Sequence, residues 1–276
     1  MNESIEFTKG PLALTQNISV AVFDFDGTIS TLRCGWENVM RPLMLECIAG
    51  GGEPSAALKE KVDRYIDEST GIQTVYQMEW LAAEVAAAGG PERDKWWYKE
   101  EYNRRLMDHI AAKKSALASG AVPPDTYRIA GAAQFLCALK NAGVELYLAS
   151  GTDHADVCEE ARLVGVYDLF TEVRGAPAHA AACSKEAVLR LLFEEKGLAG
   201  GNVLVVGDGK VEIALGHGHG AYTLGAATDE AARRGVNPVK RRRLIAAGAD
   251  AIVGDFTCTE ALTALFCPES AAASRK

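Results

Sequence analysis

Short apolar segments alternate with helical patterns along most of the chain, and this alternation constrains the fold more than any other feature. Strands that alternate with helices are typical of a parallel sheet with helices on both faces. In such sheets, ligands bind beyond the carboxyl ends of the strands. We therefore expect an α/β fold with a doubly wound parallel sheet. The expected strands are 18–24, 144–149, 202–207 and 250–253, with a weaker one at 221–225, and the expected helices are 126–142, 153–164, 184–196 and 209–217.

One long interval after the first strand interrupts this rhythm. It contains no convincing strand and reads instead as helices separated by glycine-rich breaks, and Pro123-Pro124 marks its end. The sequence therefore predicts a helical insertion between the first strand and the rest of the sheet. We expect a core formed by residues 1–30 and 122–276 and an inserted domain at 31–121, with helices near 34–49, 55–69, 73–88 and 91–118.

Two aspartates, Asp24 and Asp26, stand at the end of the first apolar strand, followed by Gly27 and Thr28. Because successive side chains of a strand alternate between its faces, the two carboxylates point the same way. Crowded carboxylates repel each other and raise each other's pKa. The pattern fits a cation held between them, or one carboxylate that attacks while the other moves protons. The ordinary alternative is a strand end whose aspartates bond turn amides.

The expected strand at 144–149 ends in Ser150-Gly151-Thr152-Asp153, just before a helix. A hydroxyl at this position can bind a phosphate oxygen beside the free amides of the helix. Ser150 stands at the strand tip, which favours the phosphate role, whereas Thr152 and Asp153 fit an ordinary helix N-cap better. Lys185 begins a later helix, where a cation opposes the helix dipole, so it is a weak candidate for binding an anion.

The fourth signal is Gly207-Asp208-Gly209 at the end of the expected strand 202–207, with Glu212 following shortly. Asp208 is placed to hold a hard cation such as Mg²⁺, which takes oxygen ligands and usually keeps some of its waters. Glu212 reaches the same region, where it can act as a ligand, act through water, or hold Lys185.

In order and spacing, these signals resemble the haloacid dehalogenase-like phosphatase superfamily, in the phosphoglycolate phosphatase and β-phosphoglucomutase-like branch. The four signatures are Asp24-Phe25-Asp26-Gly27-Thr28, Ser150, Lys185, and Gly207-Asp208 with Glu212. The resemblance implies a Rossmann-like core and a mobile α-helical cap inserted between the first two signatures. The fourth signature more often closes with an aspartate, so Glu212 is a departure.

The resemblance also implies a role for each site residue. Asp24 is expected to be the nucleophile that forms an aspartyl-phosphate, and Asp26 the general acid and base. Ser150 and Lys185 are expected to stabilise the transferring phosphoryl group. The expected Mg²⁺ ligands are Asp24, the backbone carbonyl of Asp26, Asp208 and Glu212, and the expected substrate-binding residues are Thr28, Arg33, Ser150, Gly151 and Lys185. The second aspartate, Asp26, favours phosphate esters over halides, because a halide leaves without a proton.

Substrate choice is expected in the cap, which closes over the site and excludes water. Arg33 is the strongest candidate there, because it lies just after the first signature. The aromatic residues Trp36, Tyr76 and Trp80 fit the helical spacing of a core better than that of a ligand platform. Arg41 and Gln73 are weaker candidates.

Composition limits the alternatives. The 276 residues carry a net charge of −8, which argues against nucleic acid as the main partner, and no apolar run approaches the length of a membrane span. We expect a cytoplasmic monomer or homodimer that does not associate with membranes. The seven scattered cysteines include no CxxC pair and suggest neither a zinc site nor a disulfide framework. The basic run Lys240-Arg241-Arg242-Arg243 is expected on an exposed helix face.

The leading interpretation is a Mg²⁺-dependent phosphatase acting on a small phosphomonoester, such as a sugar phosphate or a phosphoglycolate-like compound. A nucleoside monophosphate is an alternative, because the cap carries aromatic residues. A phosphoglucomutase-like phosphotransferase would share Asp24 and Asp26 but return the phosphoryl group to a sugar. A binding protein on an inactive scaffold would show no turnover with Mg²⁺. A different nucleotide-binding α/β fold would need a Gly-rich loop after the first strand, which Gly27 alone does not supply.

Overall fold

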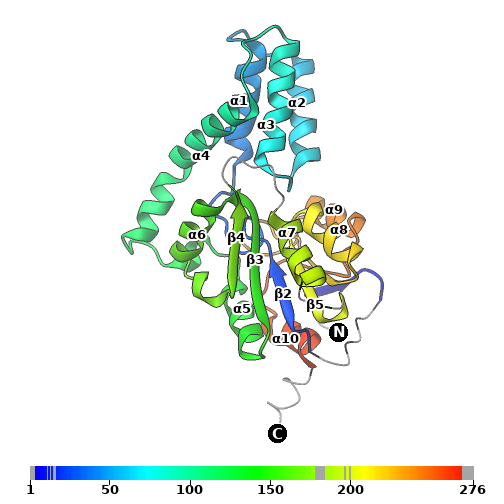
Figure 1. Cartoon of the computed structure of the whole chain (residues 1–276). Helices are drawn as coiled ribbons and strands as arrows, with labels where there is room; N and C mark the ends of the chain where they lie inside the picture. Colours follow the sequence, from blue (N-terminus) through cyan, green and yellow to red (C-terminus); the bar gives the residue numbers. More distant parts are fainter. Residues whose placement is uncertain are drawn as a thin grey trace.

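A seven-stranded sheet forms the centre of the protein, which we describe from a computed structural model (Figure 1). The structure describes residues 4–10, 12, 14, 17–177, 184–195, 197–198 and 200–268. The strand order is β1-β7-β6-β5-β2-β3-β4, and all neighbours are parallel except β1, which runs antiparallel to β7. The strands are β1 (Ile5–Phe7), β2 (Val20–Phe23), β3 (Glu145–Asp153), β4 (Glu172–Ala176), β5 (Val203–Gly207), β6 (Tyr222–Ala226) and β7 (Ala251–Val253).

Helices cover both faces of this sheet. The α-helices of the core are α5 (Ala132–Asn141), α6 (His154–Leu163), α7 (Ser184–Arg190), α8 (Lys210–Gly218), α9 (Pro238–Ala246) and α10 (Thr259–Phe266). Shorter helical turns are η1 (Pro124–Tyr127), η2 (Tyr167–Leu169), η3 (Leu191–Glu195) and η4 (Gly200–Asn202). Strand β2 explains the layering, because Phe23 packs with residues of α5, α6 and α10, whereas Val20 and Val22 pack with α7. A strand buried on both faces must be apolar at every position, as β2 is. The doubly wound α/β fold is therefore confirmed.

Most of the expected elements occur close to their expected bounds, with a few differences. The helix expected at 126–142 begins only at Ala132, because residues 124–127 form the turn η1 and Gly131 adopts a positive φ of 77°. The strands β1 and β4 and the helix α10 were not expected. The basic run does lie on a helix, α9, but Lys240 turns inward, so its expected exposure was wrong.

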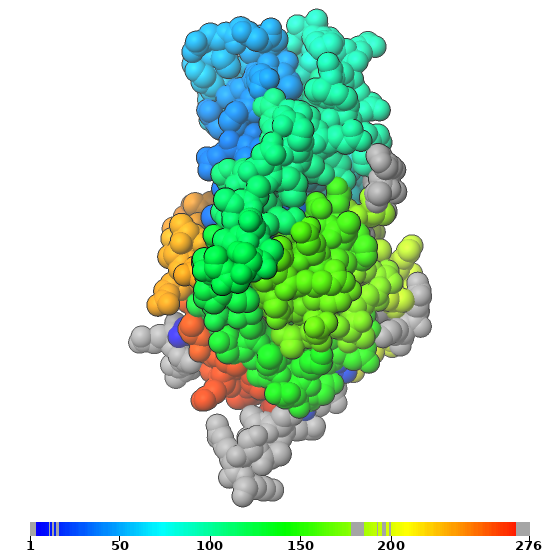
Figure 2. All heavy atoms as spheres, turned by 90° about the vertical axis from the view of Figure 1, so that its left-hand side faces the viewer, coloured from blue at the N-terminus to red at the C-terminus, as the bar shows by residue number. Residues whose placement is uncertain are grey.

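Four helices form a bundle that stands beyond one end of the sheet (Figures 1 and 2). They are α1 (Glu37–Ala49), α2 (Ala56–Ser69), α3 (Thr74–Ala87) and α4 (Lys95–Ala118). The side chain of Ser55 caps α2, that of Asp94 caps α4, and Gly50 ends α1 in the left-handed conformation. The bundle has a hydrophobic core of its own that includes Met40, Leu43, Met78, Leu81, Leu106 and Ile110. We call this bundle the cap.

Long helix α4 joins the cap to the rest of the protein, because its later turns run beside α6 (Figure 2). Trp36 and Trp80 pack against the core of the cap, and Trp80 also stacks on Tyr65 with ring centroids 3.8 Å apart. Tyr76 is instead exposed at the surface. Among the described residues, no helix is long and apolar enough to cross a membrane. Six of the seven cysteines are free thiols, and Cys183 lies outside the described residues.

Candidate active site

The carboxyl ends of three adjacent strands bring the sequence signatures together. Strand β2 lies between β3 and β5, and Phe23 is in register with Leu148 on one side and Val206 on the other. Asp24 therefore follows β2 at the level of Ala149 and Gly207, each one residue before the next signature. Ser150 lies near the end of β3, and Asp208 directly follows β5. Because parallel strands end at the same edge of the sheet, residues far apart in the sequence meet in one site.

Lys185 connects two of these signatures. Its Nζ atom lies 3.0 Å from Asp24 Oδ2 and 2.8 Å from Glu212 Oε2, and its side chain is buried. Burial by itself would lower the pKa of Lys185, but the carboxylates of Asp24 and Glu212 raise it above its usual range. The lysine is therefore a permanent cation beside Asp24.

Glu212 is held in place by the backbone as well as by Lys185. Its Oε1 atom accepts a hydrogen bond of 2.6 Å from the amide of Gly209, at the start of α8. A Cβ atom at Gly207 would lie 2.3 Å from Glu212 Oε1, and one at Gly209 would lie 2.9 Å from it. The glycines on either side of Asp208 are therefore required by the close approach of this carboxylate. Of the three roles considered for Glu212, holding Lys185 is the one observed here.

Asp24, Asp208 and Glu212 form an acidic cluster that is suited to a metal ion. One carboxylate oxygen from each lies within 4.8 Å of the others. Gly27 makes room for this arrangement, because a Cβ atom there would lie 2.3 Å from Asp208 Oδ2. Burial raises the pKa of Asp24 well above its usual range; Lys185 opposes this rise, and Glu212 and Asp208 add to it. Hard oxygen donors crowded in this way fit Mg²⁺.

Lys240 is an unexpected neighbour of this cluster. It reaches in from α9, and its Nζ atom lies 2.6 Å from Asp208 Oδ2 and 2.5 Å from Glu230 Oε1. Burial would lower the pKa of Lys240, but Asp208 and Glu230 raise it above its usual range. Motif spacing carries no signal for this lysine, because it belongs to a run of four basic residues that resembles a solvated helix face.

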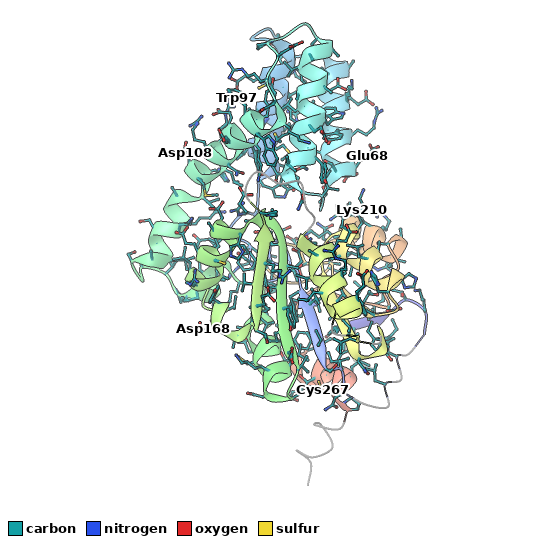
Figure 3. All side chains as sticks on the ribbon, viewed as in Figure 1. Glu68, Trp97, Asp108, Asp168, Lys210 and Cys267 are labelled. Atoms are coloured by element: carbon teal, nitrogen blue, oxygen red, sulfur yellow. The ribbon has the colours of Figure 1, made fainter. Side chains whose placement is uncertain are left out.

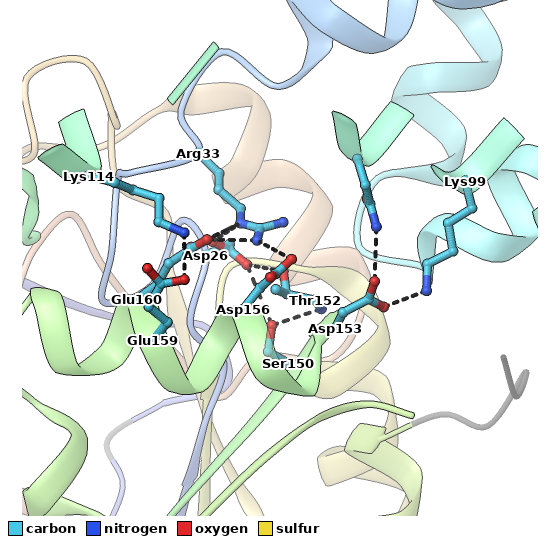
Figure 4. Close-up of polar contacts among 11 residues, drawn as sticks. Asp26, Arg33, Lys99, Lys114, Ser150, Thr152, Asp153, Asp156, Glu159 and Glu160 are labelled. Atoms are coloured by element: carbon cyan, nitrogen blue, oxygen red, sulfur yellow. Dashed lines mark hydrogen bonds and ion pairs between the residues drawn. The ribbon is translucent and has the colours of Figure 1, made fainter. Parts of the chain in front are cut away.

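Asp26 is oriented by the tip of β3. Its Oδ2 atom accepts a hydrogen bond of 2.8 Å from Thr152 Oγ1 and a longer one of 3.5 Å from Ser150 Oγ (Figure 4). Its Oδ1 atom has no hydrogen-bond partner among the described residues, and Arg33 Nε lies 3.9 Å from it. Thr152 is therefore a site residue that the helix-cap interpretation missed. Its position two residues after Ser150, on the same face of the strand, is a signal that would have identified it.

Asp153 does stand at the N-cap position of α6, but its side chain makes no capping hydrogen bond. It binds the cap instead, because it pairs with Lys99 and accepts a hydrogen bond of 2.9 Å from Asn103, both on α4 (Figure 4). Across the site, Lys210 donates a hydrogen bond to the backbone carbonyl of Glu68 at the end of α2 (Figure 3). Polar contacts therefore attach the cap to the core on two sides of the strand tips.

Arg33 lies in the connection from β2 to the cap and is engaged by the core. Its guanidinium donates three hydrogen bonds to Glu160 on α6, from Nη2 at 2.7 Å and from Nε at 3.0 and 3.2 Å, and one of 3.3 Å to Asp156 (Figure 4). Glu160 has no exposed surface. Arg33 thus positions the first cap connection against α6, and its contact with substrate stays a prediction.

A cavity lies between the strand tips and the cap. Asp24, Asp26, Ser150, Gly151, Lys185 and Asp208 line its core side, together with Arg33. Thr28 is fully buried and is not among the lining residues, so its contact with substrate also stays a prediction. The cap side and its connection add Cys34, Trp36, Thr70, Gly71, Ile72, Thr74, Gln77, Tyr102 and Leu106, and the loop after β6 adds Glu230.

A parallel sheet with carboxylates at its strand tips and a buried lysine beside them, under a helical cap, defines the haloacid dehalogenase class of α/β proteins. The chain belongs to the haloacid dehalogenase-like hydrolase family, because the sequence model of that family matches residues 18–220. No curated protein matches the chain significantly.

Solved structures share this fold at low sequence identity. A β-phosphoglucomutase from Clostridium difficile has a TM-score of 0.62 at 14% identity, covering 92% of this chain and 99% of the other. A predicted phosphoglycolate phosphatase from Haemophilus somnus has a TM-score of 0.60 at 16% identity, covering 91% and 100%. A haloacid dehalogenase-like family protein from Streptococcus pneumoniae has a TM-score of 0.58 at 15% identity, covering 89% and 98%. At these identities the similarity establishes the fold alone.

Proposed function

We propose that this protein is a Mg²⁺-dependent phosphatase that hydrolyses a small phosphomonoester, such as a sugar phosphate, through an aspartyl-phosphate. The observation that carries the proposal is the buried Asp24 carboxylate, 3.0 Å from Lys185 Nζ and beside Asp208, at the cavity end of β2. A carboxylate, a fixed positive charge and further oxygen donors lie around one point, and this supports the proposal because phosphoryl transfer depends on positioning and charge stabilisation.

The two aspartates of the first signature take separate roles in this reaction. Asp24 attacks the phosphorus atom, the bond from phosphorus to the leaving oxygen breaks, and an acyl phosphate forms. Asp26 donates a proton to the leaving alcohol and then takes a proton from the water that hydrolyses the intermediate. Thr152 supports this role because it fixes one oxygen of Asp26, while the other has no hydrogen-bond donor among the described residues.

Side chains and backbone around Asp24 supply groups that can balance the negative charge on the transferring phosphoryl group. Lys185 lies against Asp24, and Ser150 and Gly151 line the same end of the cavity. Fixed donors of this kind stabilise developing charge without reorganising during the reaction. Glu212 acts through Lys185, because its hydrogen bonds from Gly209 and Lys185 hold the ammonium at the nucleophile.

The chemistry of the donor set fits Mg²⁺. Asp24, Asp208 and the backbone carbonyl of Asp26 would hold the ion, with Glu212 as a further candidate ligand. When bound, Mg²⁺ screens the repulsion between the carboxylates and the incoming phosphate. Both carboxylate oxygens of Glu212 accept hydrogen bonds from the protein, which favours Asp208 over Glu212 as the direct ligand.

Metal binding should change how stability depends on pH. Because the pKa of Asp24 is raised on folding, the folded protein binds a proton more tightly than the unfolded chain. Stability in EDTA should therefore fall as the pH rises from the usual aspartate pKa through the raised value. Mg²⁺ competes with this proton, so its stabilising effect should grow over the same pH window, to about 2.7 kcal/mol at a hundred times Kd.

Urea unfolding at a series of pH values, in EDTA and in Mg²⁺, measures this effect. Asp24→Asn is the control, because it removes the titrating group and should flatten the dependence. An equal Mg²⁺ effect at every pH in the original protein would contradict the prediction.

The function itself is tested by phosphate release from a panel of sugar phosphates, nucleoside monophosphates and phosphoglycolate, in Mg²⁺ and in EDTA. We expect release in Mg²⁺ that is lost in EDTA. Dependence on a sugar bisphosphate activator, with little free phosphate, would support a phosphotransferase instead. No turnover of any compound by the folded protein would contradict both enzymatic proposals.

A further inference from the structure

We propose that Glu230 makes the cavity select phosphate esters with an uncharged, hydroxyl-bearing leaving group and reject those whose leaving group is anionic. The inference rests on the proposed function, because it assumes that the phosphoryl group binds at Asp24 and Lys185. It concerns the leaving group, which shares the cavity with Glu230 on the side where Lys240 joins the carboxylates of Glu230 and Asp208.

The carboxylate of Glu230 is anchored on the wall of the cavity. Glu230 lies in the loop after β6, and Lys240 Nζ contacts its Oε1 atom at 2.5 Å from α9. Glu230 lines the cavity, whereas Lys240 does not, and only 12% of the Lys240 side chain is exposed. Of these two side chains, the carboxylate of Glu230 is therefore the one that a ligand in the cavity meets.

The lining of the cap side offers no charge to an anionic leaving group. Every lining residue between positions 34 and 106 is uncharged, and several carry hydroxyl or amide groups, namely Thr70, Thr74, Gln77 and Tyr102. Such groups suit the hydroxyls of a small polyol or sugar. A carboxylate or a second phosphate would find no cation on this side.

The two lining cations are already matched by carboxylates. Lys185 lies between Asp24 and Glu212. Arg33 donates three hydrogen bonds to Glu160 and a fourth to Asp156. An anionic leaving group would therefore enter the cavity beside Glu230 without a free counter-charge from the described lining residues. Like charges repel more strongly inside a protein than in bulk water.

Matched ester pairs test the inference. We would compare kcat/KM in Mg²⁺ for 2-hydroxyethyl phosphate against phosphoglycolate, and for glycerol 3-phosphate against 3-phosphoglycerate. In each pair the leaving groups are similar in size and differ by a carboxylate. We expect the original protein to prefer the uncharged member at least about tenfold, and Glu230→Gln to lower this ratio about tenfold. Because the ratio is taken within one preparation, partial misfolding of a variant cancels.

Glu37→Gln is the control. Glu37 is exposed and close enough for its charge to affect Glu230, yet it does not line the cavity. In Glu37→Gln, the ratio of kcat/KM for the uncharged ester to that for the charged ester should stay within about twofold of its value in the original protein. If Glu37→Gln and Glu230→Gln change the kcat/KM ratio by a similar factor, the effect comes from the overall negative charge near the site, and the inference is overturned. An unchanged ratio in Glu230→Gln would also overturn it.

A binding measurement separates this inference from the proposed hydrolysis. Calorimetry in Mg²⁺ with 2-hydroxyethylphosphonate and phosphonoacetate reports the same selectivity without any bond cleavage. If no ester is hydrolysed but the uncharged phosphonate binds more tightly and Glu230→Gln removes the difference, the proposed function fails and the selectivity stands. Equal binding of the two phosphonates, or a preference for phosphonoacetate, would overturn the selectivity.

Discussion

Phosphate release should fall by a factor of about 10⁴ or more when Asp24 is replaced with asparagine. The carboxamide has nearly the same shape but cannot attack phosphorus, so no acyl phosphate forms. Asp24 is buried and its carboxylate lies 3.0 Å from Lys185 Nζ, so the proposed nucleophile is held in a fixed position. The rate is measured with p-nitrophenyl phosphate and with the best substrate of the panel.

Trapping of the intermediate separates chemistry from folding. Acid quenching with a ³²P-labelled substrate should give a phosphoprotein that is sensitive to hydroxylamine, and Asp24→Asn should give none. Asp26→Asn is the matched control, because it removes the proton-transfer group next to the nucleophile. With p-nitrophenyl phosphate, whose leaving group needs little protonation, Asp26→Asn should still form the phosphoprotein but hydrolyse it slowly. Labelled protein from Asp24→Asn would assign the nucleophile to another residue.

The Asp24→Asn substitution should also leave the fold intact, because it removes one of several mutually repelling carboxylates. We expect the free energy of unfolding in EDTA to stay within about 1 kcal/mol of the original value or to rise. A large loss of stability would mean that the pairing of Asp24 with Lys185 outweighs the cost of burying its charge. The activity of Asp24→Asn would then have to be divided by the fraction of the protein that is folded.

Periodicity and strand ends predicted the layout of the site well. Strands β2, β3 and β5 are apolar on both faces, so their sequences are easily recognised, and parallel pairing brings their ends together. Once those strands were placed, Asp24, Ser150 and Asp208 had to converge. The four cap helices were also readable, because glycine and proline separate them and each contributes apolar residues to a common core.

The two strands that were not expected lack such signals. Strand β1 has three residues, and β4, at an edge of the sheet, alternates imperfectly between buried and half-buried positions. In helix α9, Leu244 alone is fully buried, so its sequence shows no apolar stripe. Helix α10, by contrast, carries a readable pair of buried residues, Leu262 and Phe266, at helical spacing.

The missed contacts depend on tertiary pairing. Lys240 reaches Asp208 from a helix that lies later in the chain, and Glu160 meets Arg33 across 127 residues of sequence. Nothing within either local segment distinguishes these charged residues from solvated ones. A single sequence identifies which residue types stand at strand tips, whereas the partners that fix their orientation emerge only when the helices pack.

Loss of the Arg33 side chain should destabilise the protein by about 3–5 kcal/mol, because it leaves the carboxylate of Glu160 buried without a counter-charge. Glu160 has no exposed surface and lies on α6, which packs beside α4. Burial raises the pKa of Glu160, and Arg33 opposes this rise, so Arg33→Met should leave a carboxyl that takes up a proton on folding. The loss of stability should therefore shrink as the pH is lowered. Urea unfolding at neutral and acid pH measures both effects.

Two comparisons show whether this pair acts as a unit. Arg33→Met combined with Glu160→Leu removes both charges and should recover most of the lost stability, because a buried ion pair contributes little net stabilisation over apolar side chains. Arg41→Met breaks an ion pair with Asp63 on the cap surface, where we expect a cost of about 0–1 kcal/mol. If Arg33→Met cost no more than Arg41→Met, Arg33 would be free to bind substrate anions. The Arg33 guanidinium would then be available in the cavity as a counter-charge for an anionic leaving group. The stability of the Arg33–Glu160 pair therefore also tests the assumption, made for the selectivity of Glu230, that Arg33 is already neutralised.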